Sequence, residues 1–97
     1  MGLQKISEQT GIREEILRFA LKMEEKLKEN DHKGGWNNSS ISYLLSGIER
    51  ETEELSYAVG QEGQVYTRKD RSNIISECAD VANFAMMLAD NSVQDCL

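Results

Sequence analysis

Two pairs of acidic residues are the side chains of this chain whose spacing best suits chemistry. Glu51 and Glu54 are three positions apart, and so are Glu77 and Asp80. Residues at i and i+3 of a helix share a face, so each pair directs two carboxylates toward one patch of space. Glu77 and Asp80 lie in an apolar stretch, where a carboxylate without a counter-charge is costly. Because hard cations prefer oxygen ligands, the four acids predict a site for Mg²⁺ or Mn²⁺.

Three helical stretches are expected to position these acids. The chain has no proline, and glycines at 34, 35, 60 and 63 divide it. Apolar residues recur at spacings of three and four from about 11 to 30 and from about 41 to 59. The stretch from about 72 to 90 is apolar almost all round. Charged side chains on the first stretch, including Lys22, Glu25 and Lys26, are expected to form a solvated face. The pattern predicts an all-α fold.

The length of the chain indicates one small domain, spanning 1–97, that needs a partner. A domain of 97 residues buries a modest core. Two partner helices in a chain of this size do not cover a third helix that is apolar on nearly every side. We therefore expect a helical hairpin or small bundle that completes a four-helix core in a homodimer or homotetramer.

Charge and hydropathy exclude two classes of partner. The net charge of −6 disfavours binding to a nucleic acid duplex, which attracts basic surfaces. No apolar run approaches the length of a membrane span, so we expect no membrane association and a cytoplasmic location.

The polar loop between the first two helices carries candidate substrate-binding residues. Trp36, the only tryptophan, either stacks on a nucleotide base or packs over the helix ends as a lid. Lys33, beside two glycines, either reaches a phosphate oxygen or lies exposed. His32 either contacts the base or phosphate or is a neutral surface residue.

Three further candidates belong to the third helix and the segment before it. Asn83, one turn beyond Asp80, either binds the sugar or a ligand carboxylate, or is a satisfied buried amide. Lys69 and Arg71 lie in a basic segment before the helix. They either bind a phosphate group of a substrate or are solvated.

The two acidic motifs together resemble those of a known family. The pattern Glu51-x-x-Glu54, a spacer and Glu77-x-x-Asp80 is similar to that of the MazG-like, all-α nucleoside triphosphate pyrophosphohydrolases. The stretches His-Lys-Gly-Gly-Trp at 32–36 and Glu-Cys-Ala-Asp-Val-Ala-Asn-Phe-Ala-Met-Met at 77–87 resemble more specifically its phage-type dATP/dGTP pyrophosphohydrolase branch. The motif-bearing part covers about 19–90.

The resemblance implies an activity, a cofactor and an assembly. The four carboxylates would hold one or two Mg²⁺ ions, and a water would displace pyrophosphate from the α-phosphorus of a nucleoside triphosphate. Members of the family form dimers or tetramers around a four-helix core. Arg50 stands where family motifs often carry a further glutamate. The chain therefore either uses Glu51, Glu53 or Glu54 in place of that acid or holds fewer metal ions, and the catalytic base is open.

Two rival functions account for parts of the pattern. A catalytically weak nucleotide- or metal-binding helical module would keep the acids and tolerate Arg50. A structural helical oligomer would carry the same acids as surface residues. Neither the preferred base nor the preferred sugar follows from the sequence.

Overall fold

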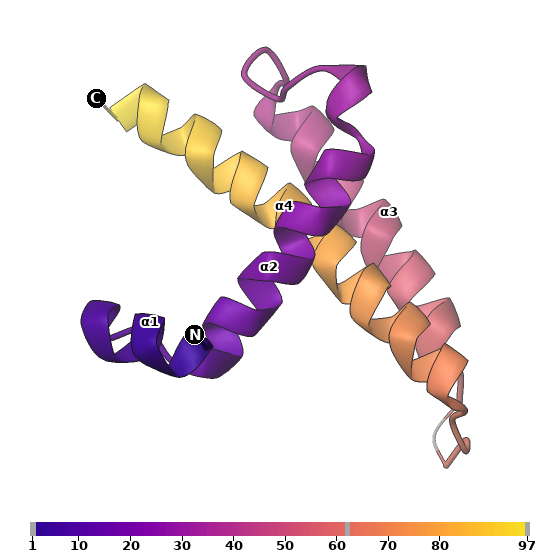
Figure 1. Ribbon diagram of the computed structural model, residues 1–97. Helices are drawn as coiled ribbons and strands as arrows, with labels where there is room; N and C mark the ends of the chain where they lie inside the picture. Colours follow the sequence, from indigo (N-terminus) through magenta and orange to yellow (C-terminus); the bar gives the residue numbers. More distant parts are fainter. Residues whose placement is uncertain (1, 62, 97) are drawn as a thin grey trace.

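The computed structural model describes residues 2–61 and 63–96, and this part of the chain contains helices and no strand. The order is α1, α2, the short 3-10 helix η1, α3 and α4 (Figure 1). Their bounds are Leu3–Thr10, Glu14–Glu29, Asp31–Lys33, Ile41–Val59 and Arg68–Cys96. The all-α fold class predicted from the sequence is confirmed.

Helix α3 has the bounds that the sequence predicts, because both ends are encoded locally. The Ser40 side chain accepts a hydrogen bond from the Tyr43 backbone N–H at 3.1 Å and caps the first turn. Gly60 follows the last turn with a φ of 72°, a conformation that side chains rarely adopt. Because the helix runs between these two residues, Glu51 lies near its middle.

Helix α4 is longer than the predicted stretch from 72 to 90. The Thr67 hydroxyl accepts a hydrogen bond from the Asp70 N–H at 3.1 Å, and the Asp70 carboxylate accepts one from the Thr67 N–H at 2.9 Å. This reciprocal capping box starts the helix at Arg68. Lys69 and Arg71 therefore lie in the first turn of α4, and not in a loop. After Asp90 neither glycine nor proline interrupts the helix.

The N-terminal region also differs from the prediction, which has no helix before 11. Helix α1 ends at Thr10 and is capped by Gly11, whose φ is 76° and whose N–H donates to the Ser7 carbonyl at 2.8 Å. Because Gly11 terminates one helix, α2 begins at Glu14 and not at the predicted 11.

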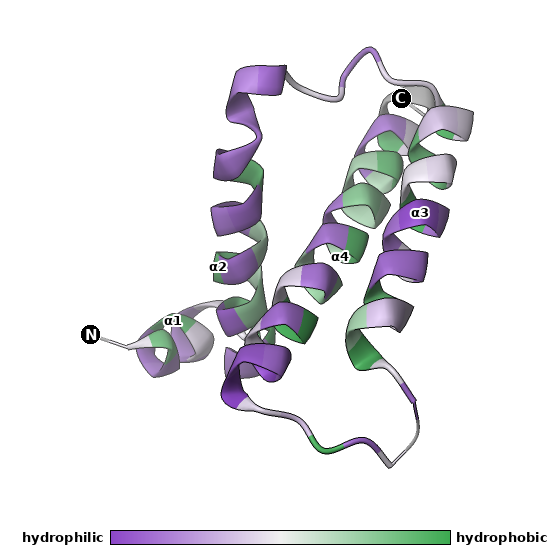
Figure 2. Ribbon diagram, turned by 90° about the vertical axis from the view of Figure 1, so that its right-hand side faces the viewer, coloured by the Kyte–Doolittle hydropathy of each residue, from purple (hydrophilic) through white to green (hydrophobic). Residues whose placement is uncertain are grey.

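Helices α3 and α4 pack side by side as a hairpin, and α2 packs on α4 (Figures 1 and 2). The hairpin is closely packed at Gly47, where a Cβ atom would lie 2.4 Å from Phe84 Cδ1. Leu44 and Ala79 are the buried apolar residues of the described chain, with 1% and 0% exposure. The Asn83 side chain ties α4 to α2 by donating to the Met23 carbonyl at 3.0 Å.

The single chain has an open shape. Its radius of gyration is 15.5 Å, whereas a compact domain of this length has about 12.5 Å. Its accessible surface is 7463 Å², whereas a folded monomer of this mass has about 5,600 Å². Part of α4 is left uncovered within one chain: Ile75 and Val93 are half exposed. None of the described helices has the length and apolar character needed to cross a membrane.

Candidate functional site

Three of the four predicted acids meet where α3 and α4 face each other. Glu51 of α3 and Glu77 and Asp80 of α4 each offer one carboxylate oxygen, and these oxygens lie within 4.8 Å of one another. The i, i+3 spacing places Glu77 and Asp80 on one face of α4, and the hairpin brings Glu51 opposite them. Oxygens at this spacing are close enough to share one hard cation.

Glu54 lies one turn further along α3, outside this close group. Its side chain is exposed, and it lines the same pocket as Glu51 and Asp80. Burial, followed by a hydrogen bond and charge repulsion from Glu54, raises the pKa of Glu51 to about 7. The fourth predicted acid therefore acts on the group electrostatically.

The surroundings of the three acids disfavour their charged forms, chiefly through burial. Burial and the neighbouring Asp80 and Glu54 raise the pKa of Glu77, and burial raises that of Asp80 against the opposing effect of Lys26. One oxygen of Glu51 (Oε2) and one of Glu77 (Oε2) are buried without a hydrogen-bond partner. Buried carboxylates of this kind favour a bound cation or a proton.

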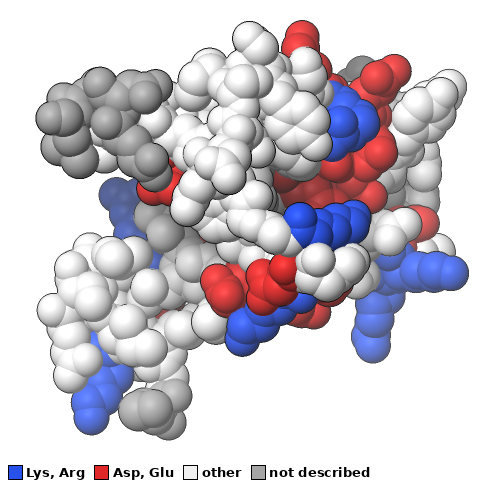
Figure 3. Space-filling view, turned by 90° about the horizontal axis from the view of Figure 1, so that it is seen from above, with Lys and Arg blue, Asp and Glu red and all other residues white. Residues whose placement is uncertain are grey.

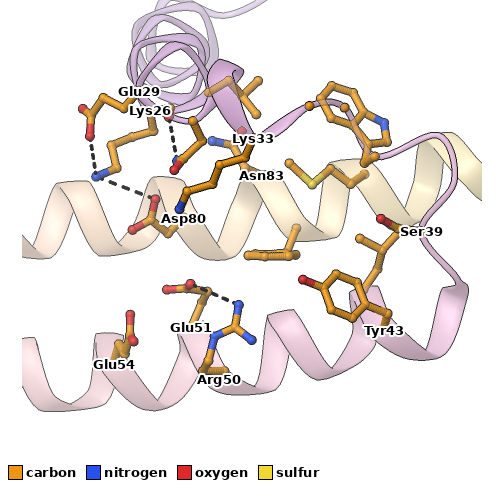
Figure 4. Close-up of a pocket in the computed structure, with 18 residues that line it drawn as sticks. Lys26, Glu29, Lys33, Ser39, Tyr43, Arg50, Glu51, Glu54, Asp80 and Asn83 are labelled. Atoms are coloured by element: carbon orange, nitrogen blue, oxygen red, sulfur yellow. Dashed lines mark hydrogen bonds and ion pairs between the residues drawn. The ribbon is translucent and has the colours of Figure 1, made fainter.

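Basic side chains from α2, η1 and α3 face the acids in the same pocket (Figure 4). Lys26 Nζ lies 3.8 Å from Asp80 Oδ1, and Arg50 Nη2 lies 3.7 Å from Glu51 Oε1. The Arg50 guanidinium also stacks over the Phe84 ring, 5.4 Å from its centroid. Lys33 points from η1 into the pocket. Acidic and basic side chains therefore face the same pocket.

The pocket has a volume of about 500 Å³, a size typical of small-molecule sites. Its walls come from α2, the 31–40 loop, α3 and α4. In the space-filling view, acidic side chains gather in a hollow with basic side chains along its edges (Figure 3). The pocket is therefore large enough for a small-molecule ligand.

The loop that carries Trp36 is fastened to the far part of α4. The Trp36 indole N–H donates to the Asp90 carboxylate at 2.9 Å. The Asn91 side-chain amide donates to the carbonyls of Trp36 and Ser39, at 2.9 and 3.0 Å. Trp36 lines the pocket, and because its N–H is occupied it offers a ligand only its ring.

Asn83 lines the same pocket and is 5% exposed. Its amide N–H₂ donates to Met23, while its Oδ1 is buried and has no partner among the described residues. Within the described residues the Asn83 amide is therefore satisfied at its N–H₂ group and not at its oxygen. An unpaired buried acceptor is costly unless a ligand or water donates to it.

Four sequence candidates do not line the pocket: Glu77, which contacts the acid group from beside it, and His32, Lys69 and Arg71. His32 is exposed on η1. Lys69 and Arg71 lie in the first turn of α4, and the Arg71 guanidinium lies 5.9 Å from the centroid of the Tyr66 ring. At 1.5 Å per residue, Arg71 is about 14 Å from Asp80 along the helix.

Lys26 is a pocket residue that the sequence pattern assigned to a solvated face. Its side chain is 17% exposed and lies between Glu29 and Asp80. The correction has a simple cause: position 26 flanks Met23 and Leu27 on the α2 face that packs on α4. In the sequence, the position of this lysine at the edge of an apolar stripe could have predicted that it is partly buried.

Comparisons with known proteins add no assignment. No family model matches the chain, and neither curated proteins nor solved structures give a match. The grounds for a function are therefore the pocket residues and the resemblance of the acidic motifs.

Proposed function

We propose that this chain is a cytoplasmic, Mg²⁺-dependent hydrolase that converts a nucleoside triphosphate into the monophosphate and pyrophosphate. The observation that carries the proposal is one pocket in which carboxylates of α3 and α4 face basic side chains of α2, η1 and α3. A complex of a divalent cation with a polyphosphate needs both kinds of partner. The MazG-like pattern of the acids agrees with this chemistry.

The acids fit a hard divalent cation. Glu51, Glu77 and Asp80 would hold it, since their oxygens converge and two of them are buried without partners. When bound, Mg²⁺ or Mn²⁺ supplies charge neutralisation at the phosphates and activation of a water. Glu54 lies outside the close group and would help to hold the ion or accept the proton of the attacking water.

The basic and aromatic residues would bind the rest of the substrate. Lys33 and Arg50 would contact phosphate oxygens, and the Arg50 guanidinium stacks over the Phe84 ring. The face of the Trp36 ring would stack on the base. The unpaired Asn83 Oδ1 would accept a hydrogen bond from the sugar or base. Together these contacts would orient the α-phosphorus toward the attacking water.

The proposed active unit is a homodimer or homotetramer. The accessible surface exceeds that of a compact monomer by about 1,900 Å², more than the roughly 800 Å² that one partner buries in a standard interface. Phe19 and Leu21 of α2 and Ile75 of α4 line an apolar groove that a second copy would cover. Light scattering at micromolar concentration tests this, and a fully active 11.0 kDa monomer would contradict it.

A nucleotide-binding module with weak turnover is the second candidate, because Arg50 pairs with Glu51 where related motifs often carry an acid. A panel of the eight common nucleotides, with pyrophosphate release measured with and without Mg²⁺, separates the candidates. The hydrolase releases pyrophosphate from at least one of them, whereas the binding module binds a nucleotide without turnover.

The metal assignment is tested with matched variants. We expect Asp80→Asn and Glu54→Gln to abolish Mg²⁺-dependent release while the helical circular dichroism is retained. Glu49→Gln, an exposed position on α3 outside the pocket, should behave as the wild type. Full activity of Asp80→Asn would refute the assignment.

A further inference from the structure

Lys26 makes an ion pair that differs in kind from the others in the described residues. The remaining pairs join neighbours on one helix, whereas Lys26 of α2 reaches Asp80 of α4. Its side chain is 17% exposed, against 53% for Arg50. A half-buried ammonium is therefore held at the edge of the acid group, at 3.8 Å from Asp80 Oδ1.

The same ammonium is also held from its other side. Lys26 Nζ lies 3.5 Å from Glu29 Oε1, and Glu29 lines the pocket as well (Figure 4). Shared between two carboxylates, the ammonium can leave Asp80 without losing every partner. A lysine on a flexible four-carbon stem also adapts more readily than an arginine to a new acceptor nearby.

A divalent cation and Lys26 compete for one carboxylate. A cation held by Asp80 places two positive charges within a few ångströms of the ammonium, and like charges at that distance repel even in a solvated cleft. Polyphosphate oxygens entering the pocket would offer the displaced ammonium a new, strongly charged acceptor.

We propose that Lys26 is the built-in counter-ion of the acid group: it competes with Mg²⁺ for Asp80 before substrate binds and contacts the phosphate chain of the substrate afterwards. This inference rests on the proposed function, because it requires a metal at the acids and a polyphosphate in the pocket. It assigns α2 a direct part in substrate binding, opposite Arg50 of α3.

Removing the Lys26 ammonium should therefore have opposite effects on the affinity for a divalent cation and on the affinity for a polyphosphate. Lys26→Gln should bind Mn²⁺, titrated without nucleotide and followed by electron paramagnetic resonance, roughly threefold to tenfold more tightly than the wild type. The same variant should bind inorganic tripolyphosphate, titrated calorimetrically with saturating Mg²⁺, roughly tenfold more weakly. Neither readout depends on turnover or on the identity of the base.

Two matched variants complete the experiment. Lys28→Gln removes the same charge from an exposed position of α2 outside the pocket and should leave both affinities within twofold of the wild type. Lys26→Arg keeps the charge and should retain the weaker Mn²⁺ affinity. Lys26→Met, which keeps the apolar stem, carries the same test if Lys26→Gln does not fold.

The outcomes separate the inference from the proposed function. Tighter Mn²⁺ binding together with weaker tripolyphosphate binding supports the role of Lys26. If the wild type binds Mn²⁺ and tripolyphosphate but loss of Lys26 weakens both or neither, Lys26 is only a structural ion pair and the inference is overturned. A wild type that binds no Mn²⁺ overturns the proposed function, and the inference with it.

Discussion

The substitution Glu51→Gln should stabilise the metal-free protein at alkaline pH while removing its response to Mg²⁺. Glu51 is 13% exposed, and one of its oxygens is buried without a partner. Its pKa is raised from 4.5 to about 7, so the folded protein retains a proton that the unfolded chain loses near pH 4.5. The protonated Glu51 carboxyl therefore makes its full contribution to the free energy of unfolding below pH 4.5. This contribution is lost as the pH rises through 7.

The size of the effect follows from that difference in pKa. Such a rise in pKa corresponds to a loss of about 3 kcal/mol in the free energy of unfolding at a pH well above 7. Solvent screening in an open pocket reduces this loss to about 1–2 kcal/mol. Glutamine has the same shape without the charge. At pH 8 in EDTA the free energy of unfolding of the variant should therefore exceed that of the wild type by about 1–2 kcal/mol. At pH 4.5 and below the two should be nearly equal.

The assay is urea denaturation followed by far-ultraviolet circular dichroism, at pH 4.5 and 8, in EDTA and in Mg²⁺. Mg²⁺ should stabilise the wild type at pH 8, because it binds the ionised carboxylates of the folded state. It should stabilise Glu51→Gln much less. Glu49→Gln serves as the exposed control on the same helix. A wild type whose stability does not change with pH, or a variant destabilised equally at both pH values, would refute the reasoning.

Three other predictions concern the hairpin and the loop. Gly47→Ala should lower the free energy of unfolding by about 1–2 kcal/mol, because the clash with Phe84 outweighs the better helix propensity of alanine; thermal melting measures it, and an unchanged melt contradicts the close packing. Trp36→Ala should raise KM more than it lowers kcat, because stacking binds ground and transition states alike; unchanged kinetics with a lower Tm would identify Trp36 as a lid. Asn91→Ala, which removes two hydrogen bonds to the loop, should cost about 1–2 kcal/mol and shift the emission of the sole tryptophan to longer wavelength; an unshifted spectrum would show that the loop does not depend on Asn91.

Local features of the sequence were sufficient to predict the helices whose ends are marked by capping residues. Ser40 and Gly60 bound α3, and the spacing of Glu77 and Asp80 alone places them on one face of α4. The start of α4 was missed although its cause is also local. Thr67 and Asp70 form a capping box that a run of charged residues concealed. Such features are readable because a cap acts within four residues of itself.

Only the tertiary structure decides which side chains share the pocket. The sequence pattern assigned Lys26 to a solvated face and left Lys69 and Arg71 as candidates for substrate binding or solvation. In the structure Lys26 faces Asp80, and the other two lie in the first turn of α4, outside the pocket. The sequence alone identified the acids, because their spacing lies within single helices. Their opposition to Glu51 depends on the hairpin, and the place of Lys26 depends on how α2 packs on α4. Such contacts join residues far apart in the chain, and packing between helices, which no local spacing encodes, determines them.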